Sequence, residues 1–331
     1  MKNVYTVLLI IFTFFVSFGY TQPTLALTVS PAKLEISGDA GTTLAGDITL
    51  FNESNRTQTF YTSFENFEPS DDSGAPLFVG NDGGLATWIS STASITLEPQ
   101  ERTQVPFTIT IPADAEAGGY FSAIFFGTQP PAAEGGTVSI GGRIGILTLL
   151  RVNGDIPEAG GVLEFKTIDD AFFYDMPPVE FEYRFSNDGG DRVIPRGDIE
   201  LKNTFGSVRD TLDANPIEGN VLPGSARRFN ITWATEEYKP SGFFNRALSQ
   251  WHNFHFGWYT AEMNLGWGYT NQTSVNTLSL LIIPWQLLIL IVATLICVFF
   301  AFKAFGKKYK QALLKQLEQE NNTKEEIEEE N

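Results

Sequence analysis

One uncharged apolar stretch, residues 280–302, most constrains how this chain can fold. As a helix rising about 1.5 Å per residue, it would measure roughly 34 Å, enough to cross a hydrocarbon core of about 30 Å. A cluster of lysines follows it, the pattern of a cytoplasmic flank, formed by Lys303, Lys307, Lys308, Lys310 and Lys315. We therefore predict a transmembrane helix over 280–302, a cytoplasmic tail over 303–331 and an extracellular region before the helix. The alternative is a buried core helix, but such helices rarely run so long without a polar face.

The first residues have the pattern of an export signal over 1–26. Lys2 gives a charged start, residues 4–18 are apolar, and Thr24, Leu25 and Ala26 form a small-residue cleavage site. Cleavage would leave a single-pass protein of the cell membrane. The alternative is an uncleaved signal anchor, which would give two passes with the same central region outside the cell.

The net charge limits which classes of partner this chain can bind, and the cysteine content indicates which kind of cell surface it comes from. The chain has 39 acidic and 22 basic residues, a net charge of −17, so an acidic exterior would repel nucleic acid, which we exclude as a partner. Its single cysteine, Cys297, lies in the predicted membrane span. An exported region without disulfides favours a bacterial cell surface over a eukaryotic ectodomain.

The region between the signal and the span is predicted to be all-β. Short predicted strands are separated by turn residues, as in Leu27–Ile36, Thr43–Phe51, Gln58–Phe67 and Arg102–Ile111, and period-two alternation is visible in several of them. A loop rich in Asp, Ser, Gly and Pro covers Pro69–Gly84, after which Trp88 and Ile89 resume the strands. About 250 residues suit two domains better than one small sandwich. The fold class is therefore two tandem immunoglobulin-like β-sandwiches plus a signal peptide and one transmembrane helix.

An internal repeat supports two similar sandwiches. Leu97-Glu98-Pro99 before a strand matches Val221-Leu222-Pro223, and the strand end at Asn52 matches that at Asn187. Gly119-Tyr120-Phe121 likewise matches Gly257-Trp258-Tyr259. Glycines and Pro157 interrupt the apolar pattern between the copies. We place the first sandwich at 27–155 and the second at 156–279.

The second sandwich carries an insertion, 239–256, that departs from the strand pattern. Ser241 is a possible cap for a short helix, with apolar residues at helical spacing: Phe244, Ala247, Leu248 and Trp251. We expect this helix to cover an open end of the sandwich. The alternative is a helix that binds a partner or lies on a membrane surface.

Residue patterns for catalysis or cofactor binding are missing, so we predict no catalytic, cofactor-binding or metal-binding residues, no cofactor and no enzyme activity. His252 and His255 have the spacing of a helical metal pair, yet no nearby acid or cysteine completes a ligand set. The many carboxylates stand beside turn residues. Two alternatives stay open: calcium held by turn oxygens, and a glycan-directed enzyme using two loop carboxylates.

Aromatic residues are dense between Trp251 and Tyr269. Rings fill sandwich cores, but they also stack on sugars or dock into partners. From this stretch we select Trp251, Phe254 and Trp258 as candidate partner-binding residues.

The order of segments resembles that of the WxL-interacting surface proteins of Gram-positive bacteria. The resemblance rests on the start Val29-Ser30-Pro31-Ala32-Lys33, the turn at Pro99, residues 117–119, two sandwiches, one span and a basic tail. It implies a peptidoglycan-binding first domain and a second domain that engages WxL-domain partners. A looser likeness is to periplasmic pilus chaperones, which are soluble.

The expected function follows from the anchored tandem sandwich. We expect a non-enzymatic protein of the cell envelope that binds cell-wall polymer or another surface protein. The alternatives are the glycan-directed enzyme and a chaperone-like factor for assembly of surface proteins. Oligomeric state is not predicted.

Overall fold

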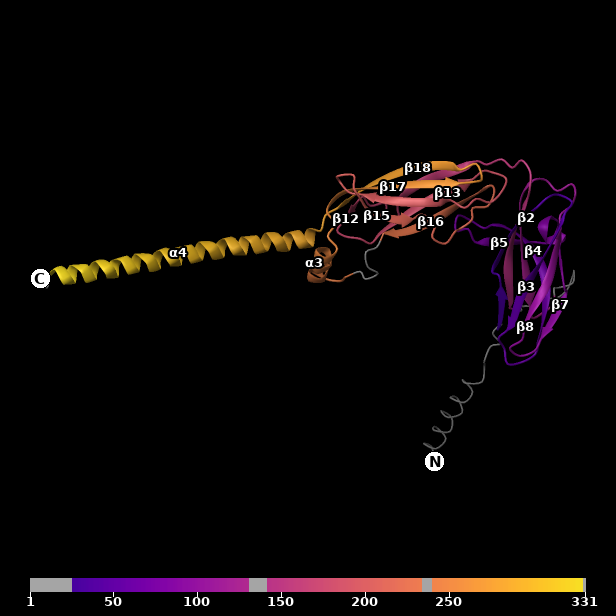
Figure 1. Ribbon diagram of the computed structural model, residues 1–331, viewed down its shortest axis with the longest axis horizontal. Coiled ribbons are helices and arrows are strands. Elements are labelled where there is room, and N and C mark those ends of the chain that lie inside the picture. The colour runs from indigo at the N-terminus through magenta and orange to yellow at the C-terminus, as the bar shows by residue number, and fades with distance from the viewer. Residues whose placement is uncertain (1–25, 131–141, 234–239, 330–331) are drawn as a thin grey trace, which may run out of the picture. The chain divides into compact units, whose positions relative to one another are not determined.

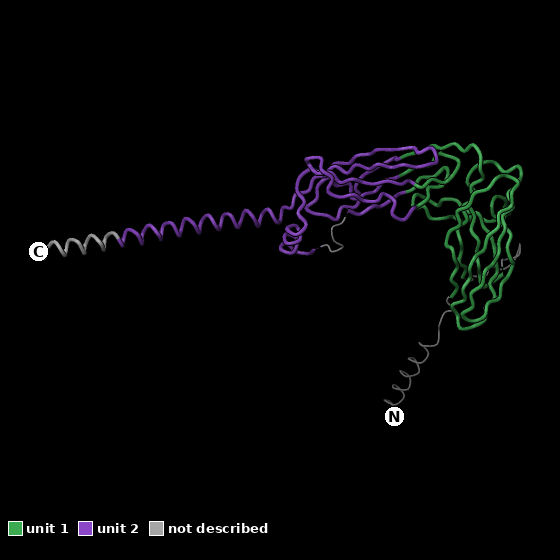
Figure 2. The backbone as a smooth tube through the Cα atoms, viewed as in Figure 1, with its two compact units in different colours: residues 1–161, 185–194, 219–227 green, residues 162–184, 195–218, 228–331 purple. Residues whose placement is uncertain are grey.

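A computed structural model describes residues 26–130, 142–233 and 240–329, with side chains described as far as residue 316 (Figure 1). The predicted signal peptide lies outside the described residues, apart from Ala26. The chain forms two compact units (Figure 2). Unit 1 is residues 1–161, 185–194 and 219–227, and unit 2 is residues 162–184, 195–218 and 228–331. Since each unit combines several segments, the division between residues 155 and 156 stays a prediction.

Unit 1 contains two facing β-sheets. One has the strand order β1 (Leu27–Ser30), β3 (Thr43–Asn52), β8 (Arg102–Thr110) and β6 (Ile89–Ser91). The other has the order β2 (Lys33–Gly38), β10 (Arg143–Val152), β9 (Gly118–Gly127), β4 (Gln58–Pro69) and β5 (Pro76–Gly80), and β7 (Ser94–Leu97) also pairs with β4. A short helix, α2 (Gly84–Trp88), precedes β6.

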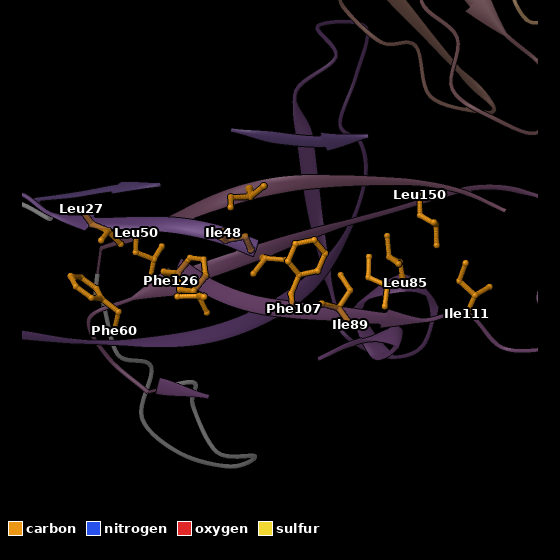
Figure 3. Packing of buried hydrophobic residues seen from close by; sticks show 14 of the residues in the cluster. Leu27, Ile48, Leu50, Phe60, Leu85, Ile89, Phe107, Ile111, Phe126 and Leu150 are labelled. Atoms are coloured by element: carbon orange, nitrogen blue, oxygen red, sulfur yellow. The ribbon is translucent and has the colours of Figure 1, made fainter. Parts of the chain in front are cut away.

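The strand order defines an immunoglobulin-like sandwich. The first strand is divided, with β1 antiparallel to β3 in one sheet and β2 parallel to β10 in the other. The remaining strands are divided between the two sheets as in immunoglobulin domains. Residues of period two meet in the core, including Ile48 and Leu50 of β3 and Phe107 and Ile109 of β8. Figure 3 shows these strands contributing side chains to one continuous apolar layer.

The second sandwich repeats this topology. One sheet has the order β11 (Gly160–Thr167), β13 (Val179–Asn187) and β16 (Ser225–Trp233). The other has the order β12 (Phe173–Tyr174), β18 (Gln272–Ile282), β17 (Gly257–Trp267), β14 (Arg196–Lys202) and β15 (Val208–Asp213). Again a short strand, β12, runs parallel to the last strand, β18. The all-β class with two immunoglobulin-like sandwiches is thus confirmed.

Two asparagines show the repeat at the level of atoms. Asn52, at the end of β3, is buried and its Nδ2 donates to the carbonyls of Leu97 and Glu98 at 3.1 and 2.9 Å. Asn187, at the end of β13, is also buried, and its Nδ2 donates to the carbonyl of Val221 at 2.9 Å. Each side chain therefore holds the strand end of its own sandwich to the turn before a later strand, β8 or β16.

Several predicted segments differ in detail. The stretch from Leu27 to Ile36 is two strands rather than one, because it changes sheets at Pro31 and Ala32. The predicted loop Pro69–Gly84 contains β5, and Trp88 ends a helix instead of starting a strand. Short elements such as these contain too few residues to show a period.

The predicted span begins too early. Residues 280–282 end β18, where Leu280 and Ile282 are buried, and helix α4 (Trp285–Glu329) starts three residues later. An apolar run does not distinguish a buried strand end from a helix start. Pro284 separates them, since it lacks the N–H that a strand ladder needs. Among the described residues, one helix, Trp285–Gln316, is long and apolar enough to cross a membrane.

Candidate functional site

The start of α4 is bonded to helix α3 (Phe243–His252), which lies beside it in Figure 1. Gln250 of α3 and Gln286 of α4 are 1% and 2% exposed, and the Gln250 amide donates to Gln286 Oε1. Gln250 Oε1 accepts from the Leu287 N–H at 3.0 Å, one of the amide groups that a helix N-terminus leaves without an intrahelical partner. Gln286 therefore lies in a buried polar network.

Asp175, just after β12, joins this network to the sandwich. Its carboxylate accepts from Gln286 Nε2 at 3.0 Å and pairs with Arg246 of α3 at 3.1 Å. The Ile283 N–H donates to the carbonyl of Tyr174 at 2.9 Å, which continues the β12–β18 pairing up to the helix. Two residues, Ile283 and Pro284, thus connect β18 with α4 and leave no length for a flexible linker.

Helix α3 exposes three of the four apolar residues that were expected to cover the sandwich. Ala247 and Gln250 are buried, whereas Phe244, Leu248 and Trp251, spaced i, i+4 and i+7, are exposed. The prediction of Ser241 as the cap is wrong. Gly242 occupies the cap position with a φ of 83°, which glycine adopts readily, and no side chain caps the helix. The apolar stripe was read correctly from the spacing, but it does not pack on the sandwich.

The three candidate partner-binding residues are all exposed. Trp251 lies on α3, Phe254 lies in the segment after it, and Trp258 lies at the start of β17. Phe254 stacks with Phe256 at a centroid distance of 6.4 Å. The alternation within β17 places Tyr259 in the core and Trp258 outside. Strand register brings this end of β17 next to α4, since Trp258 pairs with Leu281.

Sequence reasoning missed two further exposed aromatics at the same end of the sandwich. Phe205 is 91% exposed in the β14–β15 turn, and Thr204 beside it bonds the backbone of Trp258 at 3.1 Å. Phe173 of β12 pairs with Leu281 and is also exposed. The turn residues 203–207 could have drawn attention to Phe205, but only the strand register places it beside Trp258.

The two histidines have different surroundings. Neither belongs to a metal cluster, because the residues that the structure describes contain no cluster of three or more His, Cys, Asp or Glu side chains that could hold a metal ion. His252 is exposed. The His255 ring lies against Trp233 and Tyr259 at 5.2 and 5.9 Å, and its Nδ1 is 3.0 Å from the carbonyl of Asn253. Burial lowers the pKa of His255 below its ordinary value of 6.5. Asp210 opposes this change and Arg209 reinforces it.

This burial predicts the direction of a pH effect. As pH falls through about 6.5, the unfolded His255 takes up a proton that the folded ring resists, so the stability of unit 2 declines below that pH. His255→Phe should flatten the decline in melting temperature of the full chain between about pH 7 and pH 5. His252→Phe serves as the exposed control and should keep the wild-type slope. An unchanged slope in His255→Phe would contradict the assignment.

Three carboxylates with lowered pKa values take part in turns and ion pairs. A hydrogen bond with Ser73 lowers the pKa of Asp71, one with Tyr174 lowers that of Asp169, and one with Lys202 lowers that of Glu262. A general acid for glycoside hydrolysis requires a raised pKa. These three carboxylates therefore suit turns and ion pairs rather than acid catalysis.

A second surface stands out at the edge of unit 1. Strand β5 ends the order of its sheet, and its sequence, Pro-Leu-Phe-Val-Gly, carries no charge. Leu77 and Val79 are exposed, while Phe78 packs edge-on against Phe67 and Phe125 at 6.2 and 4.9 Å. The strand is therefore held in place by one face and leaves the other apolar face uncovered by the described residues.

Strand β15 holds the equivalent position in the second sandwich and is protected. It reads Val-Arg-Asp-Thr-Leu-Asp, with three charged residues in six. Charged side chains are a common way for edge strands to resist pairing with other chains. Since the two sandwiches share a topology, the contrast indicates that β5, unlike β15, is an edge strand able to pair with a strand of another chain.

No protein-family model matches the chain, and no curated protein matches it. Among solved structures, the class 5 fimbriae chaperone CfaA matches with 11% identity and a TM-score of 0.37, over 76% of this chain and 98% of that one. The Salmonella enterica SafA pilin–SafB chaperone complex matches with 10% identity and a TM-score of 0.33, over 79% and 99%. A Porphyromonas gingivalis W83 protein of unknown function matches with 12% identity and a TM-score of 0.27, over 78% and 100%. The role of this chain has to be derived from its own residues.

Proposed function

We propose that this chain is a non-enzymatic, membrane-anchored protein of the cell envelope that binds an extended segment of another surface protein along β5. In this proposal α4 crosses the membrane, the two sandwiches lie outside the cell, and the lysines after Phe302 lie in the cytoplasm. The observation that carries it is the uncharged, exposed edge of β5, in contrast to the charged sequence of β15, its counterpart in the other sandwich.

Strand addition explains what such an edge can bind. An extended partner gains main-chain hydrogen bonds along the edge, and alternate side chains gain contacts with the sheet. Here Leu77 and Val79 would contact apolar partner residues, and acidic residues of the adjoining loops, Asp71 and Asp82, would favour basic flanks. A partner with alternating apolar residues and basic flanks therefore fits better than a neutral wall polymer.

A photoreactive amino acid at position 79 should cross-link to another envelope protein in cells that produce the full chain. The matched control is position 208 in β15, because Val79 and Val208 are the same residue and are both 48% exposed. We expect a protein adduct from position 79 and none from position 208. Capture of wall polymer alone, equal adducts from both positions, or no adduct at all would contradict the proposal.

Leu77→Lys, which places a charge on β5 as in β15, should lower recovery of that partner by about tenfold or more, the effect of losing one hot-spot contact. Leu212→Lys in β15 is the control and should leave recovery unchanged. The fate of the partner separates two roles. A partner that stays bound indicates a surface receptor or scaffold, whereas a partner released into an assembled surface structure indicates a chaperone-like assembly factor.

A further inference from the structure

We infer that the end of unit 2 next to α4 is seated in the lipid headgroup region, with α3 lying along the membrane surface as an amphipathic helix. The inference rests on the membrane crossing by α4 but not on partner binding at β5. We assign lipid as the binding partner of this surface on three observations. They are the rigid attachment of α3, the side chains that α3 exposes, and the position of these side chains beside the first turn of α4.

The attachment fixes where α3 lies relative to the membrane. Gln250 bonds Gln286 and the Leu287 N–H within the first turn of α4, and Phe243 contacts the Trp285 ring at 5.9 Å. Because Trp285 is the first residue of the apolar helix, α3 has to lie at the depth where α4 enters the bilayer. Because α3 is hydrogen-bonded to the first turn of α4, its exposed face lies at the depth of the lipid headgroups.

The side chains exposed by α3 match an interfacial helix. Phe244, Leu248 and Trp251 form one apolar stripe, while the other face buries Ala247 and Gln250 against the protein. Such helices sink their apolar face about 5–10 Å into the boundary between headgroups and acyl chains. Exposing this stripe to water would be costly, because its large apolar side chains would forgo the free energy gained by burial.

The surrounding loops extend the same surface. Exposed aromatic residues at this end come from four separate segments: β12 with the residue before it, the β14–β15 turn, the segment after α3 and the start of β17. They are Phe172, Phe173, Phe205, Phe254, Phe256 and Trp258. Strand register places β12 and β17 at the α4 end of β18. Trp and other aromatic rings are enriched where proteins meet the headgroup region. Trp251, Phe254 and Trp258 are therefore assigned to lipid rather than to a protein partner.

The test measures lipid contact directly in the full chain reconstituted in nanodiscs holding one copy each. With Cys297→Ala, a single fluorescent label is attached at Trp251→Cys, Val275→Cys or Leu295→Cys. The lipid chains carry a quencher near the headgroups in one set of discs and near the bilayer centre in another, because Leu295 lies about 15 Å along α4 from Trp285. Trp251 and Val275 are 65% and 64% exposed, but Val275 lies six residues along β18 from Leu281, roughly 20 Å away.

The label at 251 should lose most of its fluorescence to the quencher near the headgroups, and the label at 295 within the span should lose it to the quencher near the bilayer centre. The label at 275 should keep its fluorescence with both. Loss of fluorescence at 295 without loss at 251 would overturn the placement of α3 in the headgroup region but would leave the membrane crossing by α4 supported. No loss at 295 would overturn the anchor as well. Equal loss at 251 and 275 would show a sandwich lying on its side and would overturn the inference.

A second variant tests the helix itself. Leu248→Asp places a carboxylate in the apolar stripe and should restore fluorescence to a label at Phe254→Cys, because the charged face leaves the headgroup region. Ala247→Asp is unsuitable as a control because Ala247 is buried, so Ser249→Asp on the same helix is used and should leave quenching unchanged. Persistent quenching in Leu248→Asp, with unchanged hydrogen exchange of β17, would contradict the proposal.

Discussion

Replacing Trp233 by alanine is expected to lower the free energy of unfolding of unit 2 by about 3–5 kcal/mol. Trp233 ends β16, is fully buried, and lies against Tyr259 at a ring distance of 5.3 Å. Its Nε1 donates to Asp210 Oδ2 at 2.7 Å. The substitution opens a large cavity and also removes the hydrogen bond that holds a partly buried carboxylate, so both costs add.

The measurement is native-state hydrogen exchange of the full chain in nanodiscs, read at the amides of β13 and β17. Trp251→Ala is the control, because this tryptophan is exposed on α3 and packs little protein around it. Its exchange in the strands should stay within about 0.5 kcal/mol of wild type. A similar loss in both variants would show that the exposed stripe, and not Trp233 alone, belongs to the core.

Asn52→Ala should destabilise unit 1 by about 2–4 kcal/mol, because the buried carbonyl of Leu97 and the partly buried carbonyl of Glu98 lose their donor. Asn52 Nδ2 is also 2.9 Å from the carbonyl of Arg56, and its Oδ1 accepts from the Ser54 N–H at 3.1 Å. Asn52→Asp should cost at least as much, since a carboxylate cannot donate. Hydrogen exchange at β3 and β8 measures the loss.

Asn55→Ala is the matched control, three residues away and exposed, and should change the free energy of unfolding by less than about 0.5 kcal/mol. The repeat supplies a second test. Asn187→Ala removes the donor to the Val221 and Asp191 carbonyls and should cause a loss of similar size. Effects much smaller than these in both variants would show that the turns hold the strand ends without the asparagines.

The strands were predictable wherever alternation extended far enough to show a period. In β8 and β17 every second residue is buried, so the residue pattern alone identifies a half-buried strand. The repeat of Asn52 and Asn187 was visible for a related reason. A side chain that must satisfy several buried carbonyls allows few substitutes, and thus the same residue appears at the same place in both copies.

The candidate site was predictable in its residues but not in its surroundings. The spacing of Phe244, Leu248 and Trp251 correctly indicated an apolar stripe, yet spacing does not tell whether the stripe meets protein or another medium. That choice depends on the fit of the opposite face, where Gln250 bonds α4. Likewise, the apolar character of Leu77 and Val79 could be read from the chain, but their position on an edge strand could not.

The sequence by itself determined the all-β class, the two similar sandwiches and an uncharged helix long enough to cross a membrane, because these depend on periodicity, repetition and length, which are local properties of the chain. Tertiary structure alone decided that Leu280 and Ile282 end a strand, that Trp233 is core while Trp251 is surface, and that α3 is bonded to the first turn of α4. Those outcomes depend on contacts between residues far apart in sequence. Apolar side chains have the same hydrophobic gain in any of these settings, so the partners that the fold brings together decide among them.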